Sequence, residues 1–215
     1  MTDVLARYAR LHSALVSDCV EAAGLGARAA APGLQPFPAE STRVVVGWAH
    51  TAEVRKTSER IEIDELLRMV GATPEDAVVV VAVDEDVQGA LWGGLMSTAV
   101  LTRGGRGAVV DGGVRDIAQI LDLGFPVWAT YRSPLDIRGR AHVVGHGGPV
   151  VFRGVQVEAG DLVFADANGV VFVPRANVEQ VLDLCEERLA REDVTDRELA
   201  AGGDPVAIYD ETGTF

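Results

Sequence analysis

The feature that most constrains this chain is an unbroken apolar run near its middle. Residues 77–83 read AVVVVAV and lie between a proline and three consecutive acidic residues. Such a run, without polar alternation, is typical of a strand covered on both faces. A second buried strand is predicted over 107–111, with helices over 95–102 and 115–123 after each run. Strands that alternate with helices in this way predict a layered α/β core with parallel pairing.

Further elements flank this core. The N-terminal part predicts helices over 2–10 and 13–23, followed by a surface loop over 27–42. A strand over 44–54, with a bulge at Gly47, and an amphipathic helix over 61–70 come next. Residues 112–113 predict a turn, followed after the next helix by a short strand over 126–129. The last third predicts short strands, a hairpin at Asn168-Gly169, a helix from about 177 to 191 and a second short helix near 195–201.

Composition favours one domain over residues 1–215, with a C-terminal helical tail from about residue 176. The chain has 215 residues, of which 48% are hydrophobic, enough for one sizeable core. The two cysteines, Cys19 and Cys185, do not have the spacing of a metal site. No secretory h-region and no apolar run of about 18 residues occurs, so we expect a cytoplasmic protein without a membrane span.

The net charge of -13 argues against nucleic-acid binding, which needs a basic face to displace counterions from phosphates. It also constrains any site for an anionic substrate. Such a site must obtain its positive charge locally, from an arginine, a metal or a helix N-terminus.

The residues best suited to chemistry stand at two successive strand-to-helix junctions. Gly93-Gly94 allows the backbone amides at the start of a helix to approach a carboxylate closely. Arg115 supplies a planar fork for a carboxylate or keto oxygen, and Asp116 supplies a hard oxygen ligand for a divalent metal. An Arg-Asp pair at a helix start can also be purely structural, because an acid there stabilises the helix dipole.

Other titratable residues are weaker candidates. Lys56 lies in a polar stretch that does not favour a Schiff-base role, and the four histidines lack metal-ligand spacing. The acidic residues Asp84, Glu85, Asp86 and Asp111 remain open as a source of a general base.

Three segments resemble the aldolase and RraA-like family. They are LVSDCVEAAG at 15–24, GGLMSTAVLTRGGRGAVVDGGVRDI at 93–117 and GVQVEAGDLVFADANGVVFVP at 154–174. The family includes 4-hydroxy-4-methyl-2-oxoglutarate aldolases that also decarboxylate oxaloacetate, and a regulator of ribonuclease E activity. The resemblance extends over about residues 10–200.

The resemblance implies a swivelling β/β/α-type fold, a homotrimer or dimer of trimers, and Mg²⁺ or Mn²⁺ as cofactor. It implies that Asp116 holds the metal and that Arg115 binds the pyruvate moiety and stabilises its enolate. The backbone N–H groups of Gly93, Gly94, Leu95 and Met96 would hold the substrate carboxylate. Glu192 of a neighbouring subunit is a further match as a metal ligand.

One departure from the family pattern affects the expected reaction. Many aldolase members carry an acid at the position of Gly94, where it assists proton transfer. Retro-aldol cleavage needs a base, whereas decarboxylation of a 3-carboxy-2-oxo acid needs only an electron sink. The sequence therefore predicts a metal-dependent carbon–carbon lyase acting on a pyruvate-type 2-oxo acid, shifted toward decarboxylation or toward a modified substrate. The alternative is a non-catalytic RraA-like regulator that binds a protein partner.

Overall fold

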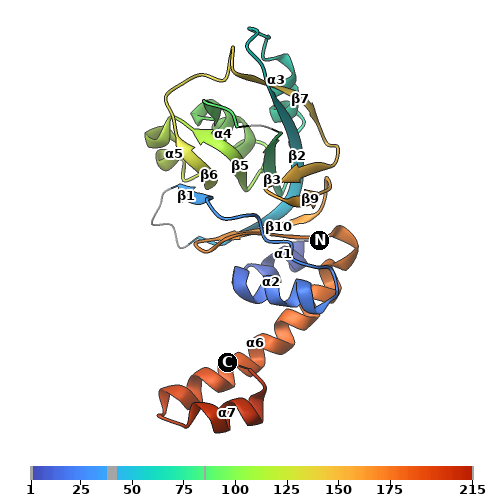
Figure 1. Ribbon diagram of the computed structural model, residues 1–215, viewed down its shortest axis with the longest axis vertical. Coiled ribbons are helices and arrows are strands. Elements are labelled where there is room, and N and C mark those ends of the chain that lie inside the picture. Colours follow the sequence, from blue (N-terminus) through green and yellow to red (C-terminus); the bar gives the residue numbers. More distant parts are fainter. Residues whose placement is uncertain (1, 38–42, 85, 215) are drawn as a thin grey trace.

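A strongly curved sheet forms the centre of the molecule in this computed structural model, which describes residues 2–37, 43–84 and 86–214 (Figure 1). Its nine strands are β1 (Gln35–Phe37), β2 (Val45–Lys56), β3 (Ala77–Val83), β4 (Ala90–Trp92), β5 (Gly107–Val114), β6 (Val127–Arg132), β7 (Ala141–His146), β10 (Leu162–Asp166) and β11 (Gly169–Val173). A separate hairpin joins β8 (Val150–Phe152) to β9 (Val155–Val157). The helices are α1 (Thr2–Tyr8), α2 (Ser13–Ala22), α3 (Asp64–Gly71), α4 (Gly94–Leu101), α5 (Ile117–Leu123), α6 (Val178–Ala200) and α7 (Pro205–Thr212), with a 3-10 turn at Arg175–Asn177.

The main path through the sheet runs β1-β6-β5-β3-β2-β10-β11. Strands β2, β3, β5 and β6 pair in parallel, and β10, β11, β1 and β7 add antiparallel edges. The short strand β4 pairs in parallel with the end of β5. The predicted mixed α/β fold with C-terminal helices is confirmed.

The two apolar faces of the central strands explain why their sequences do not alternate. Val79, Val81 and Val110 pack in the cluster that α3, α4 and α5 cover. Val78 and Val80 point to the other face, where they pack with residues of β8 to β11. Because both faces are buried, polar residues are excluded from β3, as its sequence predicts.

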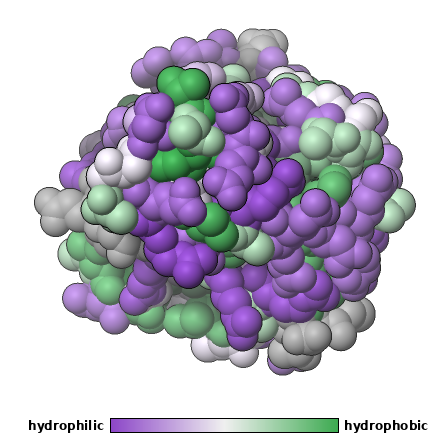
Figure 2. Space-filling model, turned by 90° about the horizontal axis from the view of Figure 1, so that it is seen from below, coloured by the Kyte–Doolittle hydropathy of each residue, from purple (hydrophilic) through white to green (hydrophobic). Residues whose placement is uncertain are grey.

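A third cluster joins α1, α2 and the first half of α6 to the outside of β10 and β11. Beyond it, α6 continues away from the sheet as an arm, and α7 folds back against it (Figure 1). Asp204 begins α7 by accepting a hydrogen bond from the Val206 N–H. Viewed from the end that carries the arm, the surface is mostly hydrophilic, with small separate hydrophobic areas (Figure 2).

Several predicted details are wrong. Gly47 pairs regularly with Val163, and the irregularity of β2 lies instead between Glu53 and Val54, opposite β7. Gly47 is needed for space, since a Cβ there would lie 2.5 Å from the Asp76 carbonyl oxygen. The predicted turn at 112–113 belongs to β5.

The predicted loop over 27–42 contains β1, although residues 38–42 lie outside the described ranges. The predicted helix near 195–201 is the end of an unbroken α6, which stops before Gly202-Gly203, and the second helix is α7. Within the described ranges, none of the helices has both the length and the apolar character that a bilayer crossing requires.

Candidate active site

Two strand-to-helix junctions meet at one edge of the sheet. Pairing of β4 with β5 places Trp92 beside Val114, and the Arg115 N–H donates to the Trp92 carbonyl at 3.0 Å. Helices α4 and α5 therefore start next to each other, at the carboxyl ends of parallel strands. This is the edge at which ligands collect in parallel sheets.

Asp116 ties the start of α5 to the start of α4. Its backbone is left-handed, with φ 58°, a conformation that aspartate tolerates better than most residues. Its Oδ2 accepts a hydrogen bond from the Gly94 N–H at 3.1 Å. A Cβ on Gly93 would lie 2.8 Å from this oxygen, so the close approach depends on glycine there.

The buried hydroxyl of Ser97 connects the start of α4 to the end of β4. Ser97 Oγ accepts a hydrogen bond from Trp92 Nε1 at 2.8 Å and donates to the Gly93 carbonyl at 3.1 Å. The N–H groups of the first turn of α4 have no partner inside the helix and are directed outward from its N-terminus. Leu95 and Met96 belong to this turn, so their amides suit a carboxylate.

Arg115 lies between two carboxylates. Its Nη1 is 3.3 Å from Asp136 Oδ2, and its Nε is 3.7 Å from Asp116 Oδ2. Arg138 holds Asp136 through contacts of 3.1 and 3.0 Å, and this hydrogen bonding keeps the pKa of Asp136 well below its usual range. Asp136 therefore stays ionised and orients Arg115, whose side chain is still 39% exposed.

These charges border a cavity of about 310 Å³ between α3, α4 and the loop that carries residues 136–138. The charged members of its wall are Arg115, Asp116, Asp136 and Arg138. Much of the remaining wall is apolar and comes from α3, β4, α4 and Ile137. The size and the mixture of an apolar wall with a few polar groups are those of a small-molecule site.

The structure brings most of the predicted site residues together. Gly93, Leu95, Met96, Arg115 and Asp116 all border this cavity, and Gly94 joins it through its bond to Asp116. Sequence reasoning missed Asp136 and Arg138, because a short Asp-x-Arg sequence in a loop carries no specific signal. It identified the amphipathic segment of α3 but did not connect it with the site.

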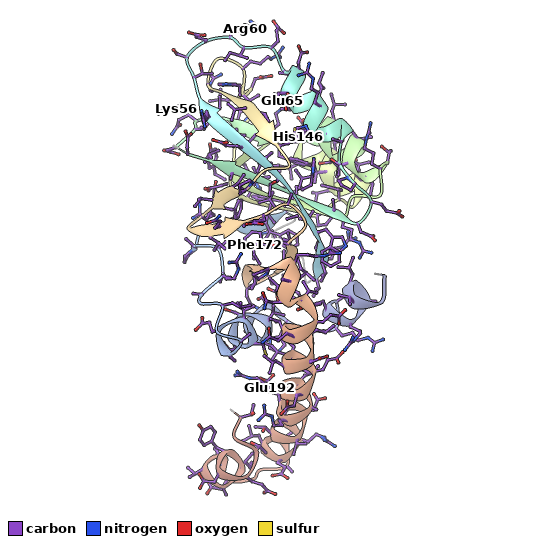
Figure 3. The ribbon with its side chains drawn as sticks, turned by 90° about the vertical axis from the view of Figure 1, so that its right-hand side faces the viewer. Lys56, Arg60, Glu65, His146, Phe172 and Glu192 are labelled. Carbon is purple, nitrogen blue, oxygen red and sulfur yellow. The ribbon has the colours of Figure 1, made fainter. Side chains whose placement is uncertain are left out.

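Glu192 lies elsewhere within the same chain. Figure 3 shows it on the α6 arm, far from Glu65 of α3. Its carboxylate accepts a hydrogen bond from Arg188 Nε at 3.1 Å and lies 3.5 Å from His12 Nε2. Any contact of Glu192 with an Arg115 site would therefore have to involve a second copy of the chain.

The residues considered as a source of a base surround a different cavity. Asp84, Asp86 and Asp111 border a hollow of about 530 Å³ that also contains Arg153. Glu85 lies outside the described residues. The structure does not place the three described acids beside Arg115.

The site suits a divalent ion that keeps most of its water. Among the described residues, no group of three or more potential metal ligands occurs. Asp116 is 44% exposed, and of its two carboxylate oxygens Oδ2 is the one that contacts other described residues, namely the Gly94 N–H and Arg115 Nε. One available carboxylate oxygen beside this cavity fits Mg²⁺ or Mn²⁺, since Mg²⁺ often binds through one or two carboxylates and several waters.

Comparison with known proteins places this chain in a family. The RraA-like family model, described as Aldolase/RraA, matches residues 13–172, and the chain belongs to this family. A protein of Halalkalibacterium halodurans, provisionally named a 4-hydroxy-4-methyl-2-oxoglutarate aldolase, is 29% identical over 76% of this chain and 75% of its own length.

Two further similarities show how varied such relatives are. Protein DlpA of Legionella pneumophila is 25% identical over 88% of this chain, which spans only 31% of DlpA. The crystal structure of RraAS2 from Streptomyces coelicolor, described as an unusual member of the RNase ES inhibitor RraA family, superposes with a TM-score of 0.80. It is 25% identical and covers 91% of this chain and 96% of its own.

Proposed function

We propose that this protein is a divalent-metal-dependent lyase that cleaves a carbon–carbon bond of a pyruvate-type 2-oxo acid. The observation that carries the proposal is the convergence of Arg115, Asp116 and the first turn of α4 on one cavity. Relatives provisionally named as aldolases support the same class of reaction.

Each group has a distinct part in this proposal. The N–H groups of Leu95 and Met96 bind the substrate carboxylate, with the helix dipole behind them. Arg115 binds the keto oxygen and stabilises the negative charge that develops there in the enolate. Asp116 holds Mg²⁺ or Mn²⁺ mainly through water, and the ion supplies Lewis acidity toward the 2-oxo group.

The surroundings of Gly94 support decarboxylation as one activity of the site. A Cβ on Gly94 would lie 2.1 Å from Gln119 Oε1, so the Gln119 amide occupies the space that a side chain at position 94 would use. An uncharged amide is no general base. Decarboxylation of oxaloacetate proceeds without one, whereas aldol cleavage has to pass the hydroxyl proton to water.

The proposal extends to the assembly. A homotrimer or dimer of trimers, in the cytoplasm, would allow the α6 arm of one subunit to bring Glu192 toward the metal of another. The projecting position of this arm supports such an exchange (Figure 1). Light scattering of the purified protein tests the assembly, and Glu192→Gln tests the contribution of this residue to metal affinity.

The test of the lyase proposal is pyruvate release from oxaloacetate and from 4-hydroxy-4-methyl-2-oxoglutarate, with Mg²⁺, with Mn²⁺ and with a chelator. The metal-only rate is subtracted, because divalent ions alone decarboxylate oxaloacetate. Asp116→Asn should abolish the metal-dependent rate, while Asp122→Asn, an exposed carboxylate on the same helix, should not change it. No release above the metal-only rate from either substrate would reject the proposal for both.

The similarity to RraAS2 supports a second candidate, a non-catalytic regulator that binds a protein partner. The net charge of -13 suits a basic partner. In that case a stable complex should form with Asp116→Asn as readily as with the unaltered protein.

A further inference from the structure

Two cationic side chains from different segments of the chain border the candidate cavity. Arg115 lies at the turn into α5, and Arg138 lies in the loop between β6 and β7. The side chain of Arg115 is 39% exposed and that of Arg138 is 46% exposed, so both are accessible to a ligand. In the proposed reaction Arg115 binds the keto oxygen, which leaves the second arginine without a role.

One carboxylate holds the two guanidinium groups close together. Asp136 Oδ2 lies 3.3 Å from Arg115 Nη1 and 3.0 Å from Arg138 Nη2. Because both nitrogens contact the same oxygen, they are at most about 6 Å apart, and without this carboxylate the two cations would repel each other. Hydrogen bonding to Arg138 keeps the pKa of Asp136 well below its usual range, so the bridge stays ionised. Two cations this close suit a substrate with a short carbon chain.

Asp136 uses only part of the donor capacity of Arg138. A guanidinium has five N–H donors in a planar fork. Arg138 donates to Asp136 from Nε at 3.1 Å and from Nη2 at 3.0 Å. No acceptor within the described ranges contacts Nη1, so its two N–H groups and the second one of Nη2 remain for a ligand. Hydrogen bonding to Asp136 is the main reason why the pKa of Arg138 is raised, and the charge of Glu62, the other nearby acid, contributes less.

The balance of charge at the site also favours a doubly charged ligand. Arg115 and Arg138 are matched by Asp116 and Asp136, so the side chains alone leave the cavity close to neutral. A divalent ion at Asp116, as proposed above, would make the site positive by two charges. A 2-oxo acid with a second carboxylate neutralises that excess, whereas a monocarboxylate leaves half of it. Because the whole chain carries a net charge of -13, an anionic substrate depends on such local positive charge.

We propose that Arg138 is a specificity-determining residue that binds the second carboxylate of a 2-oxo dicarboxylate. This inference rests on the proposed lyase function and deepens it, because it assigns a partner to the distal end of the substrate. The 2-oxo acid head lies at Arg115 and at the first turn of α4. The distal carboxylate accepts hydrogen bonds from the remaining N–H groups of Arg138, since a planar pair of N–H donors is the geometry in which arginine binds carboxylates.

Kinetics separate this role from an indirect one through Asp136. In aldol cleavage the distal carboxylate is not a reacting group, so Arg138 would bind it equally in the ground state and in the transition state. Arg138→Gln should therefore raise KM for 4-hydroxy-4-methyl-2-oxoglutarate by roughly 10- to 100-fold and leave kcat within about threefold. A residue that acts only by positioning Arg115 would instead lower kcat, because Arg115 stabilises the enolate. A fall in kcat with an unchanged KM would overturn the inference.

Two further variants test whether the fork or the charge matters. Arg138→Lys keeps the positive charge and loses the planar fork, so its KM should lie between those of the unaltered protein and Arg138→Gln. Arg68→Gln removes a 71% exposed arginine of the neighbouring helix α3, outside the cavity wall, and is the matched control. Its KM should stay unchanged. Equal increases of KM in Arg68→Gln and Arg138→Gln would overturn the inference, because they would reflect net charge alone.

A binding measurement distinguishes failure of this inference from failure of the lyase proposal. Calorimetry with Mg²⁺ compares 2-oxoglutarate with 2-oxopentanoate, which has a methyl group in place of the second carboxylate. The unaltered protein should bind 2-oxoglutarate at least about tenfold more tightly, and Arg138→Gln should remove this preference. Pyruvate release without any preference for 2-oxoglutarate would refute the role of Arg138 alone. The absence of pyruvate release from all substrates would refute the lyase proposal, and the two binding orders would still decide the role of Arg138.

Discussion

Two Arg-Asp clusters of this protein share their chemistry and differ in what their charges are used for. Arg153 donates from Nη1 to Asp111 at 2.5 Å, from Nε to the Ala31 carbonyl at 2.9 Å, and from Nη2 to the Pro32 carbonyl. Its guanidinium therefore fastens the loop at 31–32 to β5. Among the described residues, the Arg115 side chain makes longer ion-pair contacts, to Asp116 and Asp136, and it borders a cavity whose wall is largely apolar.

The difference shows why an arginine beside an aspartate does not by itself define a functional site. The Arg153 side chain is 19% exposed, against 39% for Arg115. Arg153 has three protein acceptors for its donors, so little capacity is left for a ligand. Arg115 is the more accessible of the two arginines and has N–H donors left for a ligand, and α4 begins next to it.

The largest expected effect separates the two clusters by activity. Arg115→Ala should lower kcat for pyruvate formation by roughly 100- to 1000-fold, because it removes the cation that stabilises the enolate. The unfolding midpoint should change little, since the side chain is partly exposed and its ion-pair contacts to Asp116 and Asp136 are as long as 3.7 and 3.3 Å. Steady-state kinetics and thermal unfolding measure the two quantities. Unchanged kcat would remove Arg115 from the site.

The second largest expected effect is a difference between two glycine substitutions in their cost to the free energy of unfolding. Gly113→Ala would bring a Cβ within 2.5 Å of the Gly89 carbonyl oxygen, a backbone atom that cannot move away. We expect a loss of roughly 3 kcal/mol in the free energy of unfolding, at the upper end of overpacking costs. Gly94→Ala would meet the end of Gln119, an exposed and flexible side chain, so its cost should be much smaller. Equal costs in urea denaturation would contradict this assignment.

The Arg153 cluster should respond in stability alone. Arg153→Met should lower the free energy of unfolding by roughly 2 kcal/mol, because Asp111 and the Ala31 carbonyl lose charge-assisted hydrogen bonds. Catalysis by the folded fraction should stay close to that of the unaltered protein. A large fall in kcat at full folding would show that the second cavity takes part in the reaction.

The smallest expected effect concerns His50, which contacts the end of α3. Burial lowers the pKa of His50, and a hydrogen bond to the Met69 carbonyl at the end of α3 opposes this shift only in part. The folded protein therefore binds fewer protons than the unfolded chain below the ordinary histidine pKa of about 6.5. Stability should be full above that value and decrease as the pH falls through the lowered pKa of His50.

Thermal unfolding at pH 7.5 and pH 5.5 measures this decrease. His50→Gln should make the difference between the two midpoints smaller, because glutamine does not titrate. The ring of His146 is tilted by 55° against that of His50, with ring centroids 5.5 Å apart, and His146→Gln serves as the comparison variant. A pH dependence that survives in His50→Gln would assign it to other groups.

Much of the framework was predictable from local sequence. The run at 77–83 forms β3 with the predicted bounds, since both of its faces are buried. The helix starts after Gly93 and near Arg115 follow from their glycines and from apolar periodicity. Errors occurred at 112–113 and 195–201, where glycine spacing and helix length depend on neighbours distant in sequence, such as Leu91 against Gly112.

The sequence alone identified the central residues of the proposed site, because Arg115 and Asp116 are marked by residue type and by their place after a buried strand. Only the tertiary structure decided what surrounds them. Pairing of β4 with β5 brings Gly94 to Asp116, and loop closure brings Asp136 to Arg115. The packing of α3 beside α4 then adds an apolar wall. These contacts join segments that lie 21 or more residues apart, so local propensity does not encode them, and they form only when the whole core is buried.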